Sequence, residues 1–232
     1  MSTFSEDNKP AFVRAMFERI APRYDMMNAV MTFGQHQACR RAAARLARPS
    51  RECLALDLAT GTGDFAAVLL EVEPTCRVVG LDFALEMMRR GQAKYGARVQ
   101  FVAGDMLCLP FPDNVFECSV NGFVLRNVAD VRAAFVEMYR VLAPGGRAVS
   151  LEITLPRLPV WRTVFALYFE HLVPRLGEWL SGDPQAYRYL PQSVRAFHTP
   201  EHIAALMRAV GFREVSWHRL MLGTMVVYCG IK

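Results

Sequence analysis

Short apolar runs alternate with helical periods through the middle of the chain. Strands are expected at 53–59, 76–82, 99–105, 116–123 and 146–153. Helices are expected between them at 64–72, 85–95 and 130–142. Apolar strands that are separated by helices form βαβ units, which assemble into a sheet with helices on both faces. The pattern therefore predicts an α/β fold with a doubly wound, mostly parallel sheet.

The two flanks of this alternating region follow a different pattern. Residues 1–50 carry no strand signal and predict two helices, the first of them ending near Pro22. After the fifth strand, residues 154–198 form a helical insert with an aromatic stripe, in which Pro174 is expected to break or kink the helix. A helix capped by Thr199 and a pair of antiparallel strands complete the chain. We expect one domain over 1–232, with an N-terminal helical cap and the insert as a substrate lid.

Composition narrows the class of protein. Hydrophobic residues make up 53% and charged residues 21% of the 232 residues, which is typical of a globular protein. A net charge of +5 suits an anionic partner or membrane surface, but no module that binds nucleic acid is visible. The six cysteines contain no C-x-x-C pair, and the polar N-terminus is no signal peptide, so a cytoplasmic protein with reduced thiols is expected.

The stretch "LALDLATGTGDFA" predicts a ligand site between the first strand and the following helix. Gly61 and Gly63 allow the backbone to come close to a ligand at a helix N-terminus, a feature that NAD, FAD and other adenosine cofactors share. Asp57 and Asp64 flank the turn. Two carboxylates are poorly suited to bind an anionic pyrophosphate. They suit the positively charged amine and sulfonium of S-adenosyl-L-methionine (SAM), so SAM is the expected cofactor.

Two further acids end the next two strands. Asp82 is placed to accept hydrogen bonds from a ribose diol, and Asp105 to accept one from an adenine amino group. Each acid alone is also compatible with a helix N-cap. Together with Asp57 and Asp64, they line the carboxyl edge of consecutive strands, where ligands bind in such sheets.

Several motifs resemble one family of class I SAM methyltransferases. The segment "YRVLAPGGRAVSLE" resembles the helix-PGG-strand segment of that class. "FERIAPRYDMMNAVMTFGQHQACRR", "LPFPDNVFE", "LRNVAD" and "AYRYLPQSV" resemble the ubiquinone/menaquinone biosynthesis C-methyltransferase family. The resemblance runs from about residue 12 to the end of the chain. It implies SAM-dependent C-methylation of a prenylated quinol ring, such as demethylmenaquinol or the equivalent ubiquinone precursor.

The resemblance also implies roles for individual residues. Those implied to contact the cofactor are Thr62, Asp82, Asp105, Met106, Asn121 and Gly122. Arg126 and Asn127 are implied to hold a phenolate oxygen, since an arginine stays protonated and is a poor base. Tyr24 is expected to close over the cofactor and joins them as a catalytic candidate. His171, Tyr187 and Tyr189 are candidates for the substrate pocket.

Other interpretations stay open at this point. A SAM methyltransferase that acts on a soluble aromatic natural product or another lipid fits the same motifs. The oligomeric state also stays open, and a homodimer is one possibility. His198 and His202 lack a third ligand, so no metal is expected. The arginines between 40 and 51 indicate a solvated helix face or a contact with anionic lipid headgroups, which would place the enzyme at the inner face of the membrane.

Overall fold

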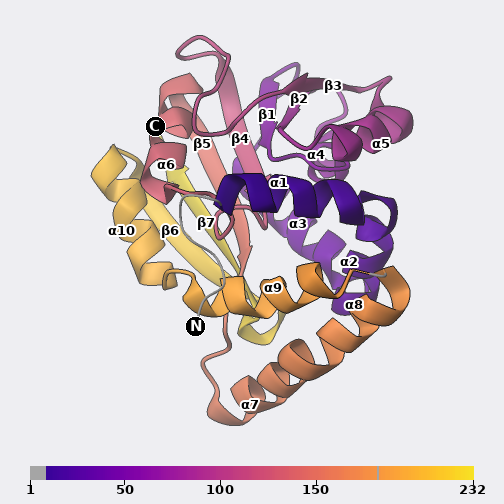
Figure 1. Ribbon diagram of the computed structural model, residues 1–232. Coiled ribbons are helices and arrows are strands. Elements are labelled where there is room, and N and C mark those ends of the chain that lie inside the picture. Colours follow the sequence, from indigo (N-terminus) through magenta and orange to yellow (C-terminus); the bar gives the residue numbers. More distant parts are fainter. Residues whose placement is uncertain (1–8, 182) are drawn as a thin grey trace.

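The computed structural model describes residues 9–181 and 183–232, in which seven strands form one sheet in the order β3-β2-β1-β4-β5-β7-β6 (Figure 1). The strands are β1 (Leu54–Leu58), β2 (Arg77–Asp82), β3 (Val99–Ala103), β4 (Phe116–Gly122), β5 (Leu142–Ile153), β6 (Arg213–Leu220) and β7 (Met225–Ile231). The first five run parallel to one another, and β7 pairs antiparallel with both β5 and β6. The predicted doubly wound, mostly parallel sheet is confirmed.

Helices cover both faces of the sheet. One face packs against α3 (Gln35–Ala47), α4 (Asp64–Val72) and α5 (Leu85–Tyr95) through a core that includes Ala43, Leu69 and Val120. The other face packs against α6 (Val131–Val141) and α10 (Pro200–Val210) through a core that includes Phe135, Met138 and Met207. The order reverses at β1, which pairs with β2 on one side and β4 on the other, so a crevice opens where these strands end.

A third core lies outside the sheet, where the N-terminal helices meet the insert. α1 (Lys9–Ile20) and α2 (Tyr24–Thr32), joined by the 3-10 turn η2 (Ala21–Arg23), pack against the insert helices through side chains such as Met16, Met27 and Phe169. The insert consists of α7 (Pro159–Leu167), η3 (Tyr168–Leu172), α8 (Val173–Ser181) and α9 (Pro184–Ala196). In Figure 1, α9 runs below α1, while α7 and α8 form the lower edge of the molecule.

Two local predictions need correction. The expected break at Pro174 is wrong, because the chain stays helical from α7 through α8. The π-helical turn at Tyr168–Leu172 comes just before this proline, and its altered hydrogen-bonding pattern accommodates the N–H that proline lacks. The fifth strand begins at Leu142 rather than Gly146, because Leu142 already pairs with Phe116 of β4. After a shift in register, the pairing continues from Arg147 opposite Cys118.

Candidate functional site

The glycine turn that follows β1 has the backbone that its sequence predicts. Gly61 and Gly63 have φ angles of 57° and 82°, in the left-handed region that glycine adopts without strain. The Asp57 carboxylate accepts hydrogen bonds from the Thr60 hydroxyl at 2.6 Å and from the Ala66 backbone N–H at 3.0 Å. Asp57 therefore fixes both ends of the turn from the inside, and burial raises its pKa to about 7.

Asp82 connects the same turn to the end of β2. Its carboxylate accepts the Gly61 N–H at 2.7 Å and the Ala84 N–H at 2.8 Å. Burial raises the pKa of Asp82, because desolvation penalises the ionised form. Each carboxylate oxygen carries a second lone pair, so the group still has the acceptor capacity that a ribose diol needs.

Two adjoining hollows follow the carboxyl ends of β1, β2 and β4, and together we call them the turn cavity. Tyr24, Ala59, Gly61 and Gly122 line both hollows. Six further predicted or flanking residues line one of them: Asp57, Thr62, Asp64, Asp82, Asp105 and Met106. The predicted cofactor residues therefore meet at one place, with Gly63 shaping the turn behind them.

Asn121 is the exception among the predicted cofactor residues. Its side chain is fully buried in the core, where its amide nitrogen donates to the Ser150 hydroxyl at 2.8 Å and contacts the Met138 sulfur at 3.6 Å. It lines neither hollow of the turn cavity. The alternation of side chains along a strand explains this, since Asn121 and the cavity-lining Gly122 point to opposite faces. The expectation that the Asn121 side chain contacts SAM is not supported by this geometry.

Arg40 is a site residue, although it was expected with its neighbouring arginines on a solvated helix face or at anionic lipid headgroups. It is instead 5% exposed and lines the turn cavity, with its guanidinium 5.5 Å above the Phe123 ring and 3.8 Å from the Asp64 carboxylate. Its Nε and Nη1 atoms are buried without a hydrogen-bond partner. Buried donors that lack an acceptor are costly, so they indicate a place for an anionic ligand group such as the carboxylate of SAM.

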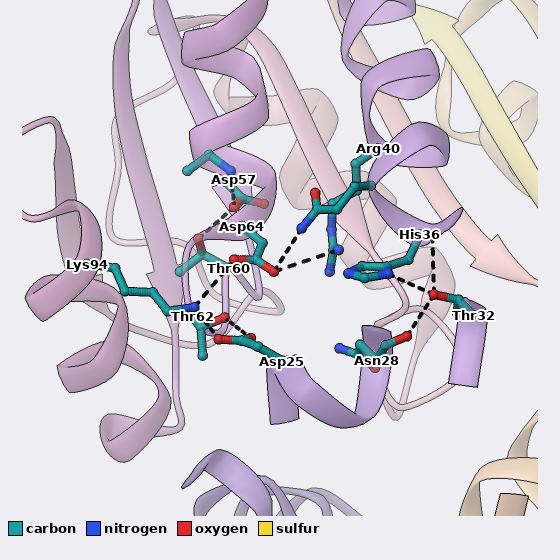
Figure 2. Close-up of polar contacts among 12 residues, drawn as sticks. Asp25, Asn28, Thr32, His36, Arg40, Asp57, Thr60, Thr62, Asp64 and Lys94 are labelled. Atoms are coloured by element: carbon teal, nitrogen blue, oxygen red, sulfur yellow. Dashed lines mark hydrogen bonds and ion pairs between the residues drawn. The ribbon is translucent and has the colours of Figure 1, made fainter. Parts of the chain in front are cut away.

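The Asp64 carboxylate is mostly engaged with the protein. Besides Arg40, it lies 3.7 Å from the Lys94 ammonium (Figure 2). It also accepts hydrogen bonds from Gln37 and Tyr95. Lys94 also forms an ion pair with Asp25, which accepts the Thr62 hydroxyl at 2.6 Å. The cap helix α2 is thereby tied directly to the glycine turn and to α5.

An apolar cavity adjoins the turn cavity and shares Tyr24, Phe123 and Asn127 with it. Its volume is about 950 Å³ including the open solvent at its mouth, and its walls come from the cap, the insert and the ends of β5 and β7. Aromatic rings such as Phe165 and Tyr187 dominate these walls. This lining suits an apolar, ring-containing molecule with a few polar atoms.

Arg126 lines the apolar cavity but is already paired. Its Nη1 donates to Glu152 at 2.5 Å and to the Phe123 carbonyl at 2.6 Å, while Glu152 is fully buried. Arg126 and Glu152 therefore form a buried salt bridge. The guanidinium still presents positive charge to the cavity, because the residue is among those that line it.

Three of the remaining predicted residues reach the apolar cavity and one does not. Asn127 accepts a hydrogen bond from the Tyr189 hydroxyl at 3.2 Å, and both side chains line the cavity together with Tyr187. His171 is exposed on the π-helical turn and does not line the cavity. The stripe of cavity-facing side chains in this insert uses Phe165, Tyr168 and Phe169, so His171 falls on the solvent side of the helix.

Tyr24 is the first of a row of polar side chains on α2 and the start of α3, and the other members of the row were not singled out from the sequence. Tyr24, Asn28, Thr32 and His36 are spaced four residues apart and all line the apolar cavity. The Thr32 hydroxyl contacts His36 Nδ1 at 2.7 Å and the Asn28 carbonyl at 2.7 Å (Figure 2). The i, i+4 spacing within an otherwise apolar segment is the signal that could have identified this row.

Two of the chemical alternatives can be examined over 9–181 and 183–232. In these residues no group of three or more His, Cys, Asp or Glu side chains is placed to hold a metal ion, and His198 stacks on His202 at 4.4 Å. No helix within them is both long and apolar enough to cross a membrane.

Known methyltransferases resemble this chain in sequence and in fold. The chain is 45% identical over 227 residues to a demethylmenaquinone methyltransferase of Roseiflexus castenholzii, covering 97% of this chain and 95% of that one. It is 41% identical to a ubiquinone/menaquinone biosynthesis C-methyltransferase of Desulfotalea psychrophila, covering 95% and 90%. A SAM-dependent methyltransferase from Thermotoga maritima has the same fold, with a TM-score of 0.68, 20% identity and coverage of 94% and 99%.

The expected enzyme class and family are thereby confirmed. The model of the ubiE/COQ5 methyltransferase family matches residues 2–232, which is nearly the whole chain. This protein belongs to the ubiE/COQ5 methyltransferase family.

Proposed function

We propose that the protein transfers a methyl group from SAM to a ring carbon of a prenylated quinol, such as demethylmenaquinol or the corresponding ubiquinone precursor. The observation that carries this proposal is the junction of two unlike cavities at Tyr24 and Asn127. One is the turn cavity, which is lined by Asp57, Asp64 and Asp82, and the other is the apolar cavity. Curated relatives named for this reaction support it.

The residues of the turn cavity fit SAM. Asp82 offers acceptors for the ribose, Asp105 and Met106 border the adenine side, and the backbone of Gly61 allows close approach. The Nε and Nη1 atoms of Arg40, which are buried without a hydrogen-bond partner, suit the carboxylate of the methionyl end. Bound SAM supplies an electrophilic methyl group on a cationic sulfur.

The protein then has to orient the quinol and exclude water. Arg126 and Asn127 hold the phenolate oxygen at the rim of the apolar cavity, where developing negative charge is stabilised by a guanidinium and an amide. Tyr187 and Tyr189 line the same cavity, and the Tyr189 hydroxyl donates to Asn127 at 3.2 Å. Tyr24 separates the two ligands, because it lines both cavities.

The prenyl tail leaves the cavity toward a membrane. The insert borders the cavity with Phe165 and Tyr168 and exposes apolar side chains on its outer face, with Val160 80% and Trp179 81% exposed. A surface of this kind suits contact with lipid. The insert therefore serves as both the lid and the membrane-facing edge, and the enzyme works at the inner face of the membrane.

A direct assay tests the proposed function. Purified protein is incubated with SAM and with demethylmenaquinol in anionic vesicles, and the quinones are measured by mass spectrometry. We expect a product heavier by one methylene and an equal amount of S-adenosylhomocysteine. Turnover with soluble aromatic phenols, and none with the quinol, would favour the alternative of a natural-product methyltransferase. Sedimentation of the same preparation determines whether it is a homodimer.

A further inference from the structure

The polar row on α2 and α3 ends in a histidine whose surroundings suggest a further role. His36 is 4% exposed, lines the apolar cavity and lies one turn beyond Thr32. A histidine is the side chain best suited to accept a proton at neutral pH. Its hydrogen bonds decide whether it can do so.

The tautomer of His36 follows from the Thr32 hydroxyl. That hydroxyl has one proton, and its oxygen lies 2.7 Å from the Asn28 carbonyl, which can only accept. The proton is therefore used there, and the hydroxyl oxygen becomes an acceptor for the His36 ring. His36 Nδ1, also 2.7 Å from this oxygen, must carry the hydrogen. Nε2 is then the bare nitrogen with a free lone pair.

Nε2 is left available to a ligand. Among the described residues, none makes a hydrogen bond to Nε2. Nε2 is also not one of the fully buried polar atoms that lack a hydrogen-bond partner, so it is not sealed inside the protein. Since His36 lines the cavity, the free lone pair belongs to the part of the ring that a ligand can reach. Asn28 Nδ2, four residues before Thr32, is by contrast buried without a partner and offers a donor in the same cavity.

The charged and titratable groups around His36 keep it neutral. Burial lowers its pKa first, and the Arg40 guanidinium on the same helix lowers it further, while Asp64 on α4 and Asp25 on α2 oppose this. Arg126 faces the same cavity as a cation. A neutral imidazole is the form that accepts a proton.

The other polar side chains of the cavity are unsuited to this step. Burial raises the pKa values of Tyr24, Tyr168 and Tyr189, so these hydroxyls stay protonated and act as donors. Arg126 stays protonated as well. Among the described residues that line the cavity, His36 alone is a base that works near neutral pH.

We propose that His36 is the general base of the methyl transfer, with Thr32 as the residue that positions its ring. This rests on the proposed function. In the overall reaction one carbon–carbon bond forms at the ring, the sulfur–methyl bond of SAM breaks, and S-adenosylhomocysteine leaves as the neutral thioether. The C–H bond at that ring carbon breaks, so the quinol loses one proton in exchange for the methyl group. His36 Nε2 takes up that proton and releases it to water when the methylated quinol departs.

The test compares His36→Gln with wild-type enzyme. Glutamine retains a donor for Thr32 but lacks a basic nitrogen. We expect kcat to fall at least ~100-fold, the lower end of general-base contributions, while the SAM dissociation constant measured by calorimetry stays within about twofold. The acid limb of the kcat profile, where protonation of His36 inactivates the wild type, should disappear in the variant.

Two further variants separate chemistry from folding. His36→Ala leaves space beside Thr32, so added imidazole should restore part of the lost rate. His218→Gln replaces an exposed histidine on the edge strand β6 and should leave kcat, its pH profile and the melting temperature unchanged. Circular dichroism checks that all variants fold.

Three outcomes would overturn the proposal. One is a His36→Gln variant with wild-type kcat and pH profile. Another is a variant that loses SAM binding in parallel with turnover, which would place His36 in the cofactor site. The third is a folded, SAM-binding His36→Ala variant that imidazole does not rescue. Failure of the proposed function looks different, because wild-type enzyme would then leave the quinol unmethylated, and the same variants would be assayed with the acceptor that it does methylate.

Discussion

At the scale of single residues, Asp57 combines a structural and an electrostatic role. Its carboxylate fixes the glycine turn through Thr60 and Ala66, yet it is 1% exposed and has a pKa of about 7. A cationic ligand in the turn cavity favours the ionised carboxylate. Binding of the cationic ligand is therefore linked to the loss of a proton from Asp57.

This coupling gives SAM binding a pH dependence. The ionised fraction of Asp57 increases as pH rises through about 7, so the affinity for the cationic cofactor should increase between about pH 6 and about pH 7.5. Calorimetry over this range measures it, in buffers of different ionisation enthalpy that report proton release. Asp57→Asn retains the size of the side chain and should remove most of the dependence. If the affinity of Asp57→Asn for SAM still depends on pH, another group is responsible for the pH dependence. Asp82 is then the next residue to test, because burial raises its pKa too.

The Arg126–Glu152 pair concerns stability as much as catalysis. Glu152 is fully buried, and Arg126 provides its charged partner at 2.5 Å. Arg126→Ala should therefore destabilise the fold by about 3–5 kcal/mol, because it leaves a buried charge uncompensated. Urea denaturation measures this loss. In the double variant Arg126→Ala/Glu152→Gln much of the stability should return while turnover stays low, and a fully active double variant would remove Arg126 from the reaction.

At the scale of elements, α2 is fastened to the glycine turn by one carboxylate. Asp25 accepts the Thr62 hydroxyl at 2.6 Å and pairs with Lys94 on α5. Asp25→Ala should loosen the cap and increase the dissociation rate of SAM by roughly 10-fold, since charge-assisted hydrogen bonds contribute about 1.5–3 kcal/mol. Stopped-flow displacement measures the rate. The matched control is Arg41→Ala, which removes an exposed ion pair with Glu71 and should change it little.

The elements themselves were largely predictable from local pattern. The predicted bounds of α4 and α5 agree with the structure because each helix has a clear apolar face and follows a strand that ends in a turn. The partners of the cap were not predictable. Arg40 reads as one of several surface arginines, and only the approach of Phe123 and Asp64, distant in sequence, shows that it is buried.

The same distinction holds for the site. Residues in the glycine turn and at strand ends could be predicted because the sheet places strand ends together, as at Asp82 and Asp105. His171 and Asn121 were misplaced because a motif gives a residue's position in sequence but not the direction of its side chain. His36 was missed because its significance depends on the cavity that the insert closes over it.

At the scale of the whole molecule, the cap and the insert act as one unit over the sheet. They share a core that includes Met16, Met27 and Phe169, and the apolar cavity lies between this core and the ends of the strands. The arginines at the end of α3 lie elsewhere. Arg48 caps that helix shortly before β1 begins, and nearby Ser50 bonds Glu117 at the amino end of β4. This end of α3 therefore lies at the amino ends of the strands, whereas the cavity lies at their carboxyl ends.

That geometry decides between the two candidate membrane contacts. A lipid surface at the arginines would lie away from the cavity, whereas α7 contributes Phe165 to the cavity wall and leaves Val160 and Leu167 80% and 58% exposed. Val160→Glu/Leu167→Glu should weaken vesicle binding at least ~10-fold, because burial of such side chains contributes about 1.5–3 kcal/mol each. Arg45→Glu/Arg48→Glu, the matched exposed control, should weaken it far less and only at low salt.

Cosedimentation and turnover together complete this last prediction. Because apolar contacts are not screened by salt, wild-type protein should retain binding to neutral vesicles and at ~0.5 M salt. The Val160→Glu/Leu167→Glu variant should lose turnover with a long-chain quinol in vesicles but keep it with a short-chain quinol in solution, since neither residue lines the cavity. If the arginine variant loses binding instead, the membrane contacts the opposite edge of the sheet. In that case the quinol must leave the bilayer before it is methylated.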